Sequence, residues 1–415
     1  MEAISHLTKG LELLTTLPDT PERTQQELTL QITLGTSLIA TKGYAAPEVG
    51  KAYARARELC QKAGETRQLL PVLAGLSTFS LVRAELQTTR ELMEQFMRLS
   101  QRGQNPADLQ VAHYVIGEVL FHWGELTQAR THLEQGLTLY DPQKRPSSAW
   151  NDPGVACLCT AAYALWSLGY PDQALKRCHE ALTLAQELSY PFSLAFALYG
   201  TTRLHQFRRE VEATREHAKT LIAISTEQGF ALRTALGIIL QGWALAEQGQ
   251  GKEGVAQIRQ GLAAHQATGA ELYRPYFLAV LAEACGKAGQ AEEGLSALTE
   301  ALTVVDKTGE CSYKAELYRL KGELLLKSKV QGPTSNVEEE VEDCFRKAIE
   351  IARKQSAKSL ELRAVMSLSR LWQQQGKKEE AWQMLAEIYG WFTEGFDTAD
   401  LQEAKALLNS LGSSV

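Results

Sequence analysis

The stretch GWALAEQGQGKEGVAQIRQGLAAHQATGAELYRPYFLAVLAEACGKAGQ, residues 242–290, carries the pattern on which the fold depends. Gly254, Ile258 and Gly261 are spaced four and three residues apart, so they share one face of a helix. Another small residue, Gly242, stands nineteen positions before Gly261, and Gly249 separates the two segments. Because glycine favours the end of a helix and a tight turn, the stretch predicts two antiparallel helices that pack through small residues.

The same triplet returns along the whole chain. Each copy has a short residue, then a larger residue four positions later, then a small or apolar residue after three more. Successive copies are 39 to 47 residues apart, which indicates one repeated unit rather than several unrelated domains. The copies are Ala3/Leu7/Gly10, Val49/Tyr53/Ala56, Thr89/Met93/Phe96, Ala129/Leu133/Gly136, Ala174/Cys178/Ala181, Ala213/His217/Thr220, Gly254/Ile258/Gly261, Gly294/Leu298/Ala301, Val341/Phe345/Ala348 and Ala381/Leu385/Ile388.

Eight units also have a small residue nineteen positions before the third triplet position, at Ser37, Ser77, Gly117, Ala162, Thr201, Gly242, Ala282 and Ser369. Tetratricopeptide units use this offset, because a small residue on the first helix lets the second approach closely. In the ninth unit the offset falls on Lys329, in a loop insertion, so Gly322 is expected to take the small position. The first helices are predicted at residues 24–41, 67–82, 108–123, 154–168, 191–206, 230–248, 273–288, 311–327 and 356–375.

The predicted fold class is therefore all-α: a right-handed superhelical solenoid of antiparallel helix pairs, in tetratricopeptide-like repeats of about 40 residues. A single array covers residues 1–415, with a half repeat at 1–17, nine helix pairs at 18–391 and a C-terminal capping helix at 392–415. We expect Asp400 to N-cap that last helix and Gly412 to end it. The chain starts inside a second helix without its partner, so we expect the natural polypeptide to extend upstream.

Charge and cysteine usage argue against several classes of function. The formal net charge is −6 and the pI is near 5.9, without a basic stripe, so nucleic acid is not expected as a partner. The seven cysteines lack the dense spacing of a disulfide framework, which predicts reduced thiols and a cytoplasmic location. No apolar run approaches the ~20 residues that cross a bilayer, so no membrane partner is expected.

No catalytic constellation is visible, and we expect no enzyme, no cofactor and no metal. GYAAPEVGKA, residues 43–52, has six residues between its glycines where a Walker A loop needs four, and GQGKEG, residues 249–254, lacks that spacing. Both are interpreted as turns. Cys157 and Cys159 lie about 200° apart on a helix, so they are not expected to share a tetrahedral metal with Cys178 and His179. His217 is interpreted as a packed core residue.

Tetratricopeptide superhelices face their first helices inward, so counting from the small residue gives candidate groove positions. These positions carry aromatic residues with two carboxylates: Tyr114, Glu118, Phe121, Tyr163, Trp166, His205, Trp243, Tyr276 and Glu283. Such a wall suits an extended peptide or protein segment, because aromatic anchors supply much of the binding energy at interfaces. Rings packed between adjacent first helices would give the same pattern, so both interpretations stay open.

Several segments carry a resemblance beyond periodicity: the stretch quoted first, DPGVACL (152–158), AELYRLKGELLL (315–326), CFRKAIEIARKQSAKSLELRAVMSLSRLWQQQGK (344–377) and YGWFTEGFDTADLQEAKALL (389–408). They resemble the C-terminal repeat region of large bacterial multidomain signal-transduction ATPases of the AAA or STAND type, often with an N-terminal adenylate or guanylate cyclase domain. The family's nucleotide-binding and catalytic residues belong to modules outside this repeat region, so none is carried over.

The resemblance implies a protein-interaction and ligand-sensing repeat domain that regulates an ATPase or effector module in the same or an associated polypeptide. Its partner would be a protein or peptide segment, foremost that upstream module. The alternative is a free-standing peptide receptor or scaffold, since quorum-sensing regulators are similar to this chain in length and helix-pair architecture. A groove rich in asparagine or arginine that grips peptide backbone and termini would favour the receptor, and the predicted inner positions hold few such residues.

Overall fold

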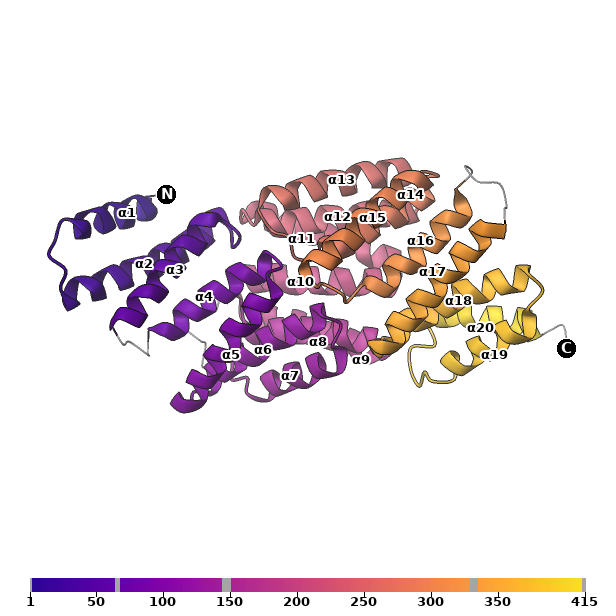
Figure 1. Cartoon of the computed structure of the whole chain (residues 1–415), viewed down its shortest axis with the longest axis horizontal. Coiled ribbons are helices and arrows are strands. Elements are labelled where there is room, and N and C mark those ends of the chain that lie inside the picture. Colours follow the sequence, from indigo (N-terminus) through magenta and orange to yellow (C-terminus); the bar gives the residue numbers. More distant parts are fainter. Residues whose placement is uncertain (1, 64–67, 144–150, 329–334, 413–415) are drawn as a thin grey trace.

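The computed structural model describes residues 2–63, 68–143, 151–328 and 335–412. These residues form twenty α-helices and no strand (Figure 1). The helices are α1 (Glu2–Thr15), α2 (Pro21–Lys42), α3 (Pro47–Ala63), α4 (Leu69–Val82), α5 (Leu86–Gly103), α6 (Pro106–His122), α7 (Leu126–Thr138), α8 (Pro153–Ser167), α9 (Pro171–Glu187), α10 (Pro191–Phe207), α11 (Val211–Glu227), α12 (Ala231–Glu247), α13 (Gly251–Ala267), α14 (Arg274–Lys287), α15 (Ala291–Thr308), α16 (Lys314–Lys327), α17 (Ser335–Lys354), α18 (Lys358–Gln374), α19 (Lys378–Tyr389) and α20 (Ala399–Gly412).

Each even-numbered helix from α2 to α18 packs against the odd-numbered helix that follows it, which confirms the predicted solenoid of helix pairs. The nine first helices begin and end within three residues of their predicted bounds. The expected turns lie at 43–46, after α2, and at 249–250, after α12. Lys329 and parts of the predicted loops 141–154 and 328–336 lie outside the described residues.

Small residues set the close approach of paired helices. A methyl group built on Gly242 of α12 would come 2.8 Å from the side chain of Ile258 and 2.9 Å from the carbonyl oxygen of Gly254, both on α13. A methyl group on Gly322 of α16 would come 2.5 Å from the ring of Phe345 on α17, so Gly322 takes the small position of the ninth unit as predicted. Side-chain carbons in packed interiors keep larger separations, so glycine permits these two approaches.

Eight of the ten predicted triplets are buried, and the other two are wrong. In α11 the buried stripe is Thr214, Ala218 and Leu221, one residue later than predicted, and His217 is half-buried rather than a core residue. The later register buries Leu221, which gains more from leaving water than the polar alternative. In α1 Ala3 is exposed, because α2 is the one helix packed closely against α1 in the described part of the chain.

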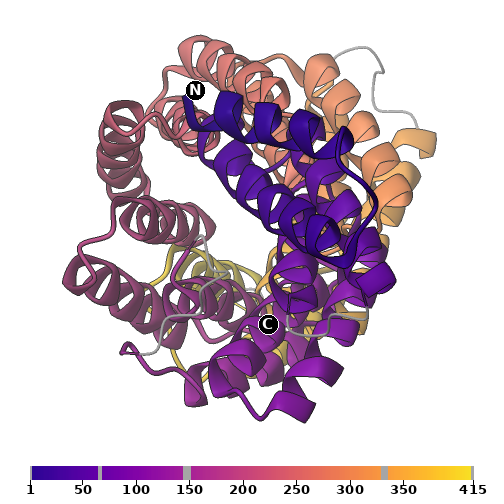
Figure 2. The ribbon, with the colours of Figure 1, turned by 90° about the vertical axis from the view of Figure 1, so that its left-hand side faces the viewer.

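The helix pairs wind around a common axis, as the end-on view in Figure 2 shows, and successive turns of the superhelix touch. The last carbonyls of a helix have no partner within that helix. Here Val82 O, at the end of α4, accepts bonds from the N–H groups of Glu271 and Leu272 at 2.9 and 3.0 Å. Trp166 O, near the end of α8, accepts a bond of 2.5 Å from the hydroxyl of Ser359, 193 positions later.

The same relationship recurs at α6 and α10. His122 O, at the end of α6, accepts bonds from the N–H groups of Cys311 and Ser312 at 2.7 and 3.0 Å. Phe207 O, at the end of α10, accepts a bond from the guanidinium of Arg363 on α18. We call these contacts at the ends of α4, α6, α8 and α10 the seam. The seam joins these four first helices to the turn of the superhelix that follows them.

A loop before α20, residues 390–398, closes the array in a similar way at α9. Glu394 Oε1 accepts hydrogen bonds from the backbone N–H groups of Asp172 and Gln173 at 2.9 and 3.0 Å. The N–H of Gly395 donates in return to Asp172 Oδ2 at 2.9 Å. Tyr170, which precedes α9, supplies no side-chain cap. Glu394 therefore caps the first turn of α9 from a distant part of the chain, and we call the loop 390–398 the clasp.

The prediction that Asp400 N-caps the last helix is wrong. Helix α20 begins at Ala399, so Asp400 lies in its first turn. Its carboxylate is buried and forms an ion pair of 2.7 Å with the buried guanidinium of Arg363. A buried cation without a partner is costlier than an uncapped helix end, which explains why the carboxylate serves Arg363. Gly412 ends α20 as expected.

Candidate functional site

Two adjoining cavities lie where the N-terminal part of the superhelix meets residues 228–273. The inner cavity, of about 130 Å³, is lined mainly by α4, α6, α10, α12 and the turn 270–273. The outer cavity, of about 360 Å³, is lined by residues 41–45, 190–192 and 228–233. Both are lined by Tyr44, Val82, Phe192, Leu232 and Arg233. We call the two cavities together the lumen site, and it lies where two turns of the superhelix meet.

Arg233 brings a buried positive charge to the boundary between the two cavities. The residue is 9% exposed, and its guanidinium carbon lies 4.5, 5.5 and 5.7 Å from the centres of the Phe196, Tyr199 and Phe192 rings. Among the described residues its Nε has no hydrogen-bond partner, and no carboxylate forms an ion pair with it. Aromatic faces offset only part of the cost of burying a cation. An anion bound beside Arg233 would offset more of that cost.

Four arginines are buried in the described part of the chain, and they fall into two classes. Arg208 and Arg363 each form an ion pair of 2.7 Å with a carboxylate. Arg203 has no such partner but is enclosed, since its guanidinium carbon lies 4.5 to 5.8 Å from the centres of five aromatic rings. Arg203 lines neither cavity. Arg233 thus combines an unpaired buried charge with open space beside it.

A buried charge cluster adjoins the lumen site through Glu118 and Tyr273, which line the inner cavity. His122 Nε2 lies 3.4 Å from Glu118 Oε1, and His122 Nδ1 lies 3.2 Å from Glu310 Oε1. The hydroxyl of Tyr273 donates to Glu118 at 2.7 Å, and that of Thr160 donates to the same carboxylate. Neither imidazole nitrogen makes a well-aligned hydrogen bond, so the contacts of His122 are mainly electrostatic.

Burial alone would lower the pKa of His122, but the carboxylates of Glu310 and Glu118 outweigh burial and raise it. Burial would likewise raise the pKa of Glu118, yet His122 and the hydroxyl donors lower it. The two carboxylates therefore favour the protonated form of the imidazole between them. Because His122 also accepts two seam bonds through its carbonyl, the cluster fixes α6 against the turn before α16.

Four of the predicted groove aromatics pack together in the middle of the superhelix. Phe121, Tyr163, Trp166 and Tyr276 are buried. The last three surround Phe207, which the prediction did not include, and Phe121 packs against Tyr163. The ring centres of Trp166, Tyr276 and Tyr163 lie 4.6, 5.6 and 5.9 Å from that of Phe207. These rings come from α6, α8, α10 and α14 and fill the centre of the superhelix. They lie where interior packing residues lie, as in the interpretation of the pattern as rings packed between first helices.

The remaining predicted residues lie in different places. Tyr114 and Glu118 line the inner cavity and so belong to the lumen site. Trp243 is buried, and its indole N–H donates to Glu283 Oε2 at 2.8 Å. Glu283 borders another cavity, nearer the C-terminus. Burial, with the nearby carboxylate of Glu247, raises the pKa of Glu283.

His205 does not join an inner wall. Its ring centre lies 5.0 Å from that of His217 on α11, and its Nδ1 lies 2.5 Å from Glu210 Oε2 in the turn between α10 and α11. His205 thus faces its own second helix, because the carboxylate and the second imidazole there supply polar partners that the aromatic interior lacks. The structure separates His205 from the other predicted groove residues.

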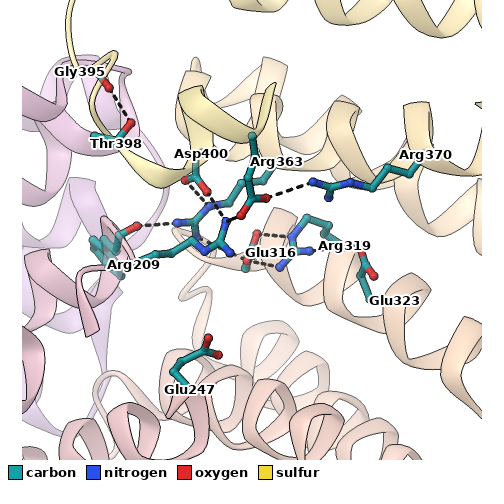
Figure 3. Close-up of polar contacts among 12 residues, drawn as sticks. Arg209, Glu247, Glu316, Arg319, Glu323, Arg363, Arg370, Gly395, Thr398 and Asp400 are labelled. Atoms are coloured by element: carbon teal, nitrogen blue, oxygen red, sulfur yellow. Dashed lines mark hydrogen bonds and ion pairs between the residues drawn. The ribbon is translucent and has the colours of Figure 1, made fainter. Parts of the chain in front are cut away.

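A charged network occupies the C-terminal end of the interior, as Figure 3 shows. Arg363 of α18 pairs with Asp400 at 2.7 Å and lies 3.6 Å from Glu316 of α16. Arg319 donates to both oxygens of Glu316 at 2.7 and 2.9 Å, and Arg209, in the turn that follows α10, lies 3.2 Å from Asp400. These groups border a cavity of about 200 Å³. Each of the three arginines has a carboxylate partner, so the network ties α10, α16, α18 and α20 together.

The cysteine grouping that resembled a metal site is a set of packed thiols. Cys157 packs with Leu133 and Ala161, whereas Cys159 belongs to a different apolar cluster. Burial raises the pKa of Cys178 to about 12. Within the described ranges no group of three or more histidine, cysteine, aspartate or glutamate side chains is placed to hold a metal ion. Nor is any helix of that part both long and apolar enough to cross a membrane.

Counting from the small residues missed the two unpaired arginines. Arg203 lies two residues after Thr201, and Arg233 lies nine residues before Gly242, so neither falls on a counted position. The signal that points to them is a single basic residue in an otherwise largely apolar first helix. Both α10 and α12 have this composition. Because long charged side chains are rarely buried, such a residue indicates a special role.

Comparison with known proteins places the chain among repeat proteins. No known protein-family profile matches it. A curated protein of Rhizobium meliloti (strain 1021), itself uncharacterised, is 23% identical over 378 residues, which make up 89% of this chain and 36% of the relative. The chain thus spans about a third of the length of that relative.

Solved structures of similar fold are tetratricopeptide and quorum-sensing proteins. A Rap protein complexed with Competence and Sporulation Factor superposes with a TM-score of 0.57 over 85% of this chain and 99% of that chain, at 13% identity. The apo form of the quorum sensor NprR from B. thuringiensis gives 0.50 over 88% and 98%, at 11% identity. A STAND protein with a tetratricopeptide repeat sensor from Pyrococcus horikoshii gives 0.46 over 92% and 55%, at 13% identity. The fold is a tetratricopeptide-type superhelix.

Proposed function

We propose that the chain is a protein-interaction and ligand-sensing repeat domain that regulates an ATPase or effector module in the same or an associated polypeptide. The observation that carries the proposal is the position of the lumen site across the seam. Val82 lines both cavities, and its carbonyl accepts the seam bonds from Glu271 and Leu272. Leu272 also lines the inner cavity. A ligand in the lumen site would therefore contact both turns of the superhelix and favour their closure.

Closure of the superhelix would carry the effect of ligand binding to the rest of the array. The seam and the clasp join α4, α6, α8, α9 and α10 to the C-terminal half of the array. Rigid helix pairs move as units when the contacts between them change, so tightening or loosening the seam would alter the surface that a partner recognises. The longer relative supports the proposal, because 36% of its length aligns with 89% of this chain and the rest is available for other modules.

We propose no catalytic role, no cofactor and no nucleic-acid partner for this array. The buried ionisable groups described above are paired with one another or enclosed by aromatic rings, which suits structural support rather than acid and base chemistry. The exception, Arg233, carries a charge that does not titrate in the physiological range. The seven cysteines form no disulfide in the described part of the chain, which suits a reducing, cytoplasmic location. We also propose that the whole chain is one array, as its uniform helix pairs suggest.

A second candidate function is a free-standing peptide receptor. Two polar side chains at the lumen site favour it. Arg233 is unpaired, and both amide atoms of Asn151, which lines the inner cavity, lack hydrogen-bond partners among the described residues. Such groups are suited to peptide termini and backbone. The likeness to a Rap protein complexed with Competence and Sporulation Factor shows the fold, and it makes this candidate worth testing.

Reconstitution separates the two candidates. The ATPase or effector module associated with this chain is assayed with and without the repeat array, and the array is expected to change its output about fivefold or more. The matched control is an array with an exposed substitution, Glu387→Gln on α19. Output that is the same with and without the array would refute the regulatory function, whereas peptide binding by the isolated array in that case would support the receptor.

A further inference from the structure

We infer that the lumen site binds the C-terminal residue of an apolar peptide, with Arg233 holding the terminal carboxylate. This inference rests on the proposed sensing function and gives its ligand a chemical class. In this arrangement the side chain of the last residue enters the inner cavity. The residues before it pass through the outer cavity toward the surface.

The positive charge of Arg233 favours an anionic ligand. Arg233 is the buried arginine that has neither a carboxylate partner nor a complete aromatic enclosure, and it lines both cavities. Glu118, on the inner cavity wall, is engaged by His122, Tyr273 and Thr160 and so presents little free negative charge. A carboxylate that reached Arg233 would form a charge-assisted pair in a setting of low dielectric.

The walls of the inner cavity call for an apolar side chain. Its lining includes Leu81, Val111, Val115 and Leu236. A volume of about 130 Å³ is close to that of a cavity of about 150 Å³ that takes up benzene. An aliphatic or aromatic side chain such as that of leucine or phenylalanine is of this size. A cationic side chain would lose its hydration there without compensation, because Glu118, the carboxylate on this wall, is already paired.

Asn151 distinguishes a peptide from a simple fatty carboxylate. The Oδ1 and Nδ2 atoms of its side chain are buried and have no partner among the described residues. An asparagine amide can pair with one backbone N–H and one backbone carbonyl at the same time. A hydrocarbon chain offers neither group, so Asn151 would stay unsatisfied around it. The inner cavity thus has one feature for each part of a C-terminal residue: carboxylate, side chain and backbone amide.

The test uses a defined synthetic pool. Acetylated pentapeptides built from alanine, valine, leucine and phenylalanine are made in two forms, one with a free C-terminal carboxylate and one with a C-terminal amide. Acetylation removes the amino-terminal charge, so the two forms differ by the carboxylate alone. Binding to the full chain is measured by affinity selection with mass spectrometry, and affinities of enriched peptides by calorimetry. 4-Methylpentanoate serves as a small carboxylate without a peptide backbone.

We expect the wild-type chain to retain acids over their matched amides by about tenfold or more, the factor typical of losing a charge-assisted contact. Arg233→Gln should abolish that preference, and Arg233→Lys should restore part of it. Arg177→Gln, at a partly exposed position on α9, is the matched control and should bind as wild type. Asn151→Leu should weaken acids and amides alike, because it removes the backbone contact rather than the charge contact.

Three results would overturn the inference: equal retention of acids and amides, retention of no peptide at all, or calorimetric binding of 4-methylpentanoate as tight as that of the best acid. Because acids and amides are compared on the wild-type chain, a failure of Arg233→Gln to fold would leave the test decisive. The regulatory function is read separately, from effector output. An array that controls its effector yet ignores the carboxylate would refute the ligand chemistry and leave the proposed function standing.

Discussion

Glu394 Oε1 accepts a hydrogen bond of 2.9 Å from the backbone N–H of Asp172, although 222 positions of sequence separate the two residues. A helix leaves its first N–H groups and its last carbonyls without partners. The clasp satisfies such groups at the start of α9, and the seam satisfies them at the ends of α4, α6, α8 and α10. The superhelix is therefore closed through polar groups that any helix end would leave free.

Replacing Glu394 with alanine tests the clasp. Loss of an N-cap costs about 0.5 to 2 kcal/mol, so we expect a decrease of that order in the free energy of unfolding. Hydrogen exchange at the amides of Asp172 and Gln173 should also become faster, since both donate to Glu394. The control is Glu387→Ala, at an exposed position on α19, which should leave both quantities unchanged. Equal behaviour of the two variants would show that the clasp does not cap α9.

The His122 cluster predicts a pH dependence of stability. Glu118 and Glu310 face the imidazole, and Tyr273 lies beside it; together the carboxylates raise the pKa of His122 above its ordinary value of about 6.5. A raised pKa gives stability that is complete below the ordinary pKa and is lost as pH rises through the raised value. The free energy of unfolding should therefore fall on the alkaline side of about pH 6.5.

His122→Gln should flatten that alkaline dependence, because the titrating group is gone. The measurement is denaturant unfolding at a series of pH values from about pH 6 upward, which begins near the ordinary pKa of histidine. His6→Gln, at an exposed position on α1, is the control and should keep the wild-type profile. The lowered pKa of Glu118 acts in the opposite direction, and its contribution is lost only as pH falls below the usual range of a carboxyl group. A His122→Gln profile as steep as wild type would contradict the cluster's ion pairing.

Gly242→Ala tests the packing of helix pairs. The added methyl would meet Ile258 at 2.8 Å and Gly254 O at 2.9 Å. Overpacking of this kind costs about 1 to 3 kcal/mol, and the larger Gly242→Leu should cost at least as much. Gly103→Ala, where an added methyl meets nothing within 4 Å, is the matched control. Stability is measured by thermal and chemical denaturation. Equal stability of Gly242→Ala and Gly103→Ala would contradict the close packing of α12 on α13.

Trp243→Ala and Trp166→Ala decide between the packing and binding interpretations of the inner aromatics. Both side chains are buried, so their truncation should cost about 3 to 5 kcal/mol of folding free energy. Trp382→Ala, where the ring is 41% exposed, should cost far less. Retention of the acid peptide pool by the fraction that remains folded should be unchanged. Normal stability with lost peptide binding would instead assign the two tryptophans to a partner-binding wall.

Much of the fold can be predicted from the sequence, because helix pairs depend on local spacing. Gly242, Gly254 and Gly261 predict the approach of α12 and α13 from three positions alone. The register of α11 was missed because His217 fits the spacing of the large residue, while the alternative with Leu221 buries more apolar surface. The spacing predicts clearly that a helix forms. It predicts less clearly which of two adjacent faces of that helix is buried.

The candidate site is harder to predict, because it depends on contacts between distant parts of the chain. The bond between Ser359 and Trp166 spans 193 positions and has no local signal. Counting from small residues placed Phe121 and Tyr163 on an inner surface, but it could not show that rings from α10 and α14 fill the space beside them. Arg233 lies outside the counted positions. Its importance follows from the lack of an ion-paired carboxylate among the described residues, which depends on the whole tertiary structure.

The most direct test of the central claim, that the superhelix is closed around its lumen by the seam, is amide hydrogen exchange on the intact chain. The N–H groups of Glu271, Leu272, Cys311 and Ser312 donate to carbonyls in the preceding turn of the superhelix. They should exchange as slowly as amides inside the helices. The amides of Gly229 and Gly269, bonded only within their own turns, should exchange much faster. Equal, fast exchange at all six amides would mean that the seam is open in solution, and it would contradict the account.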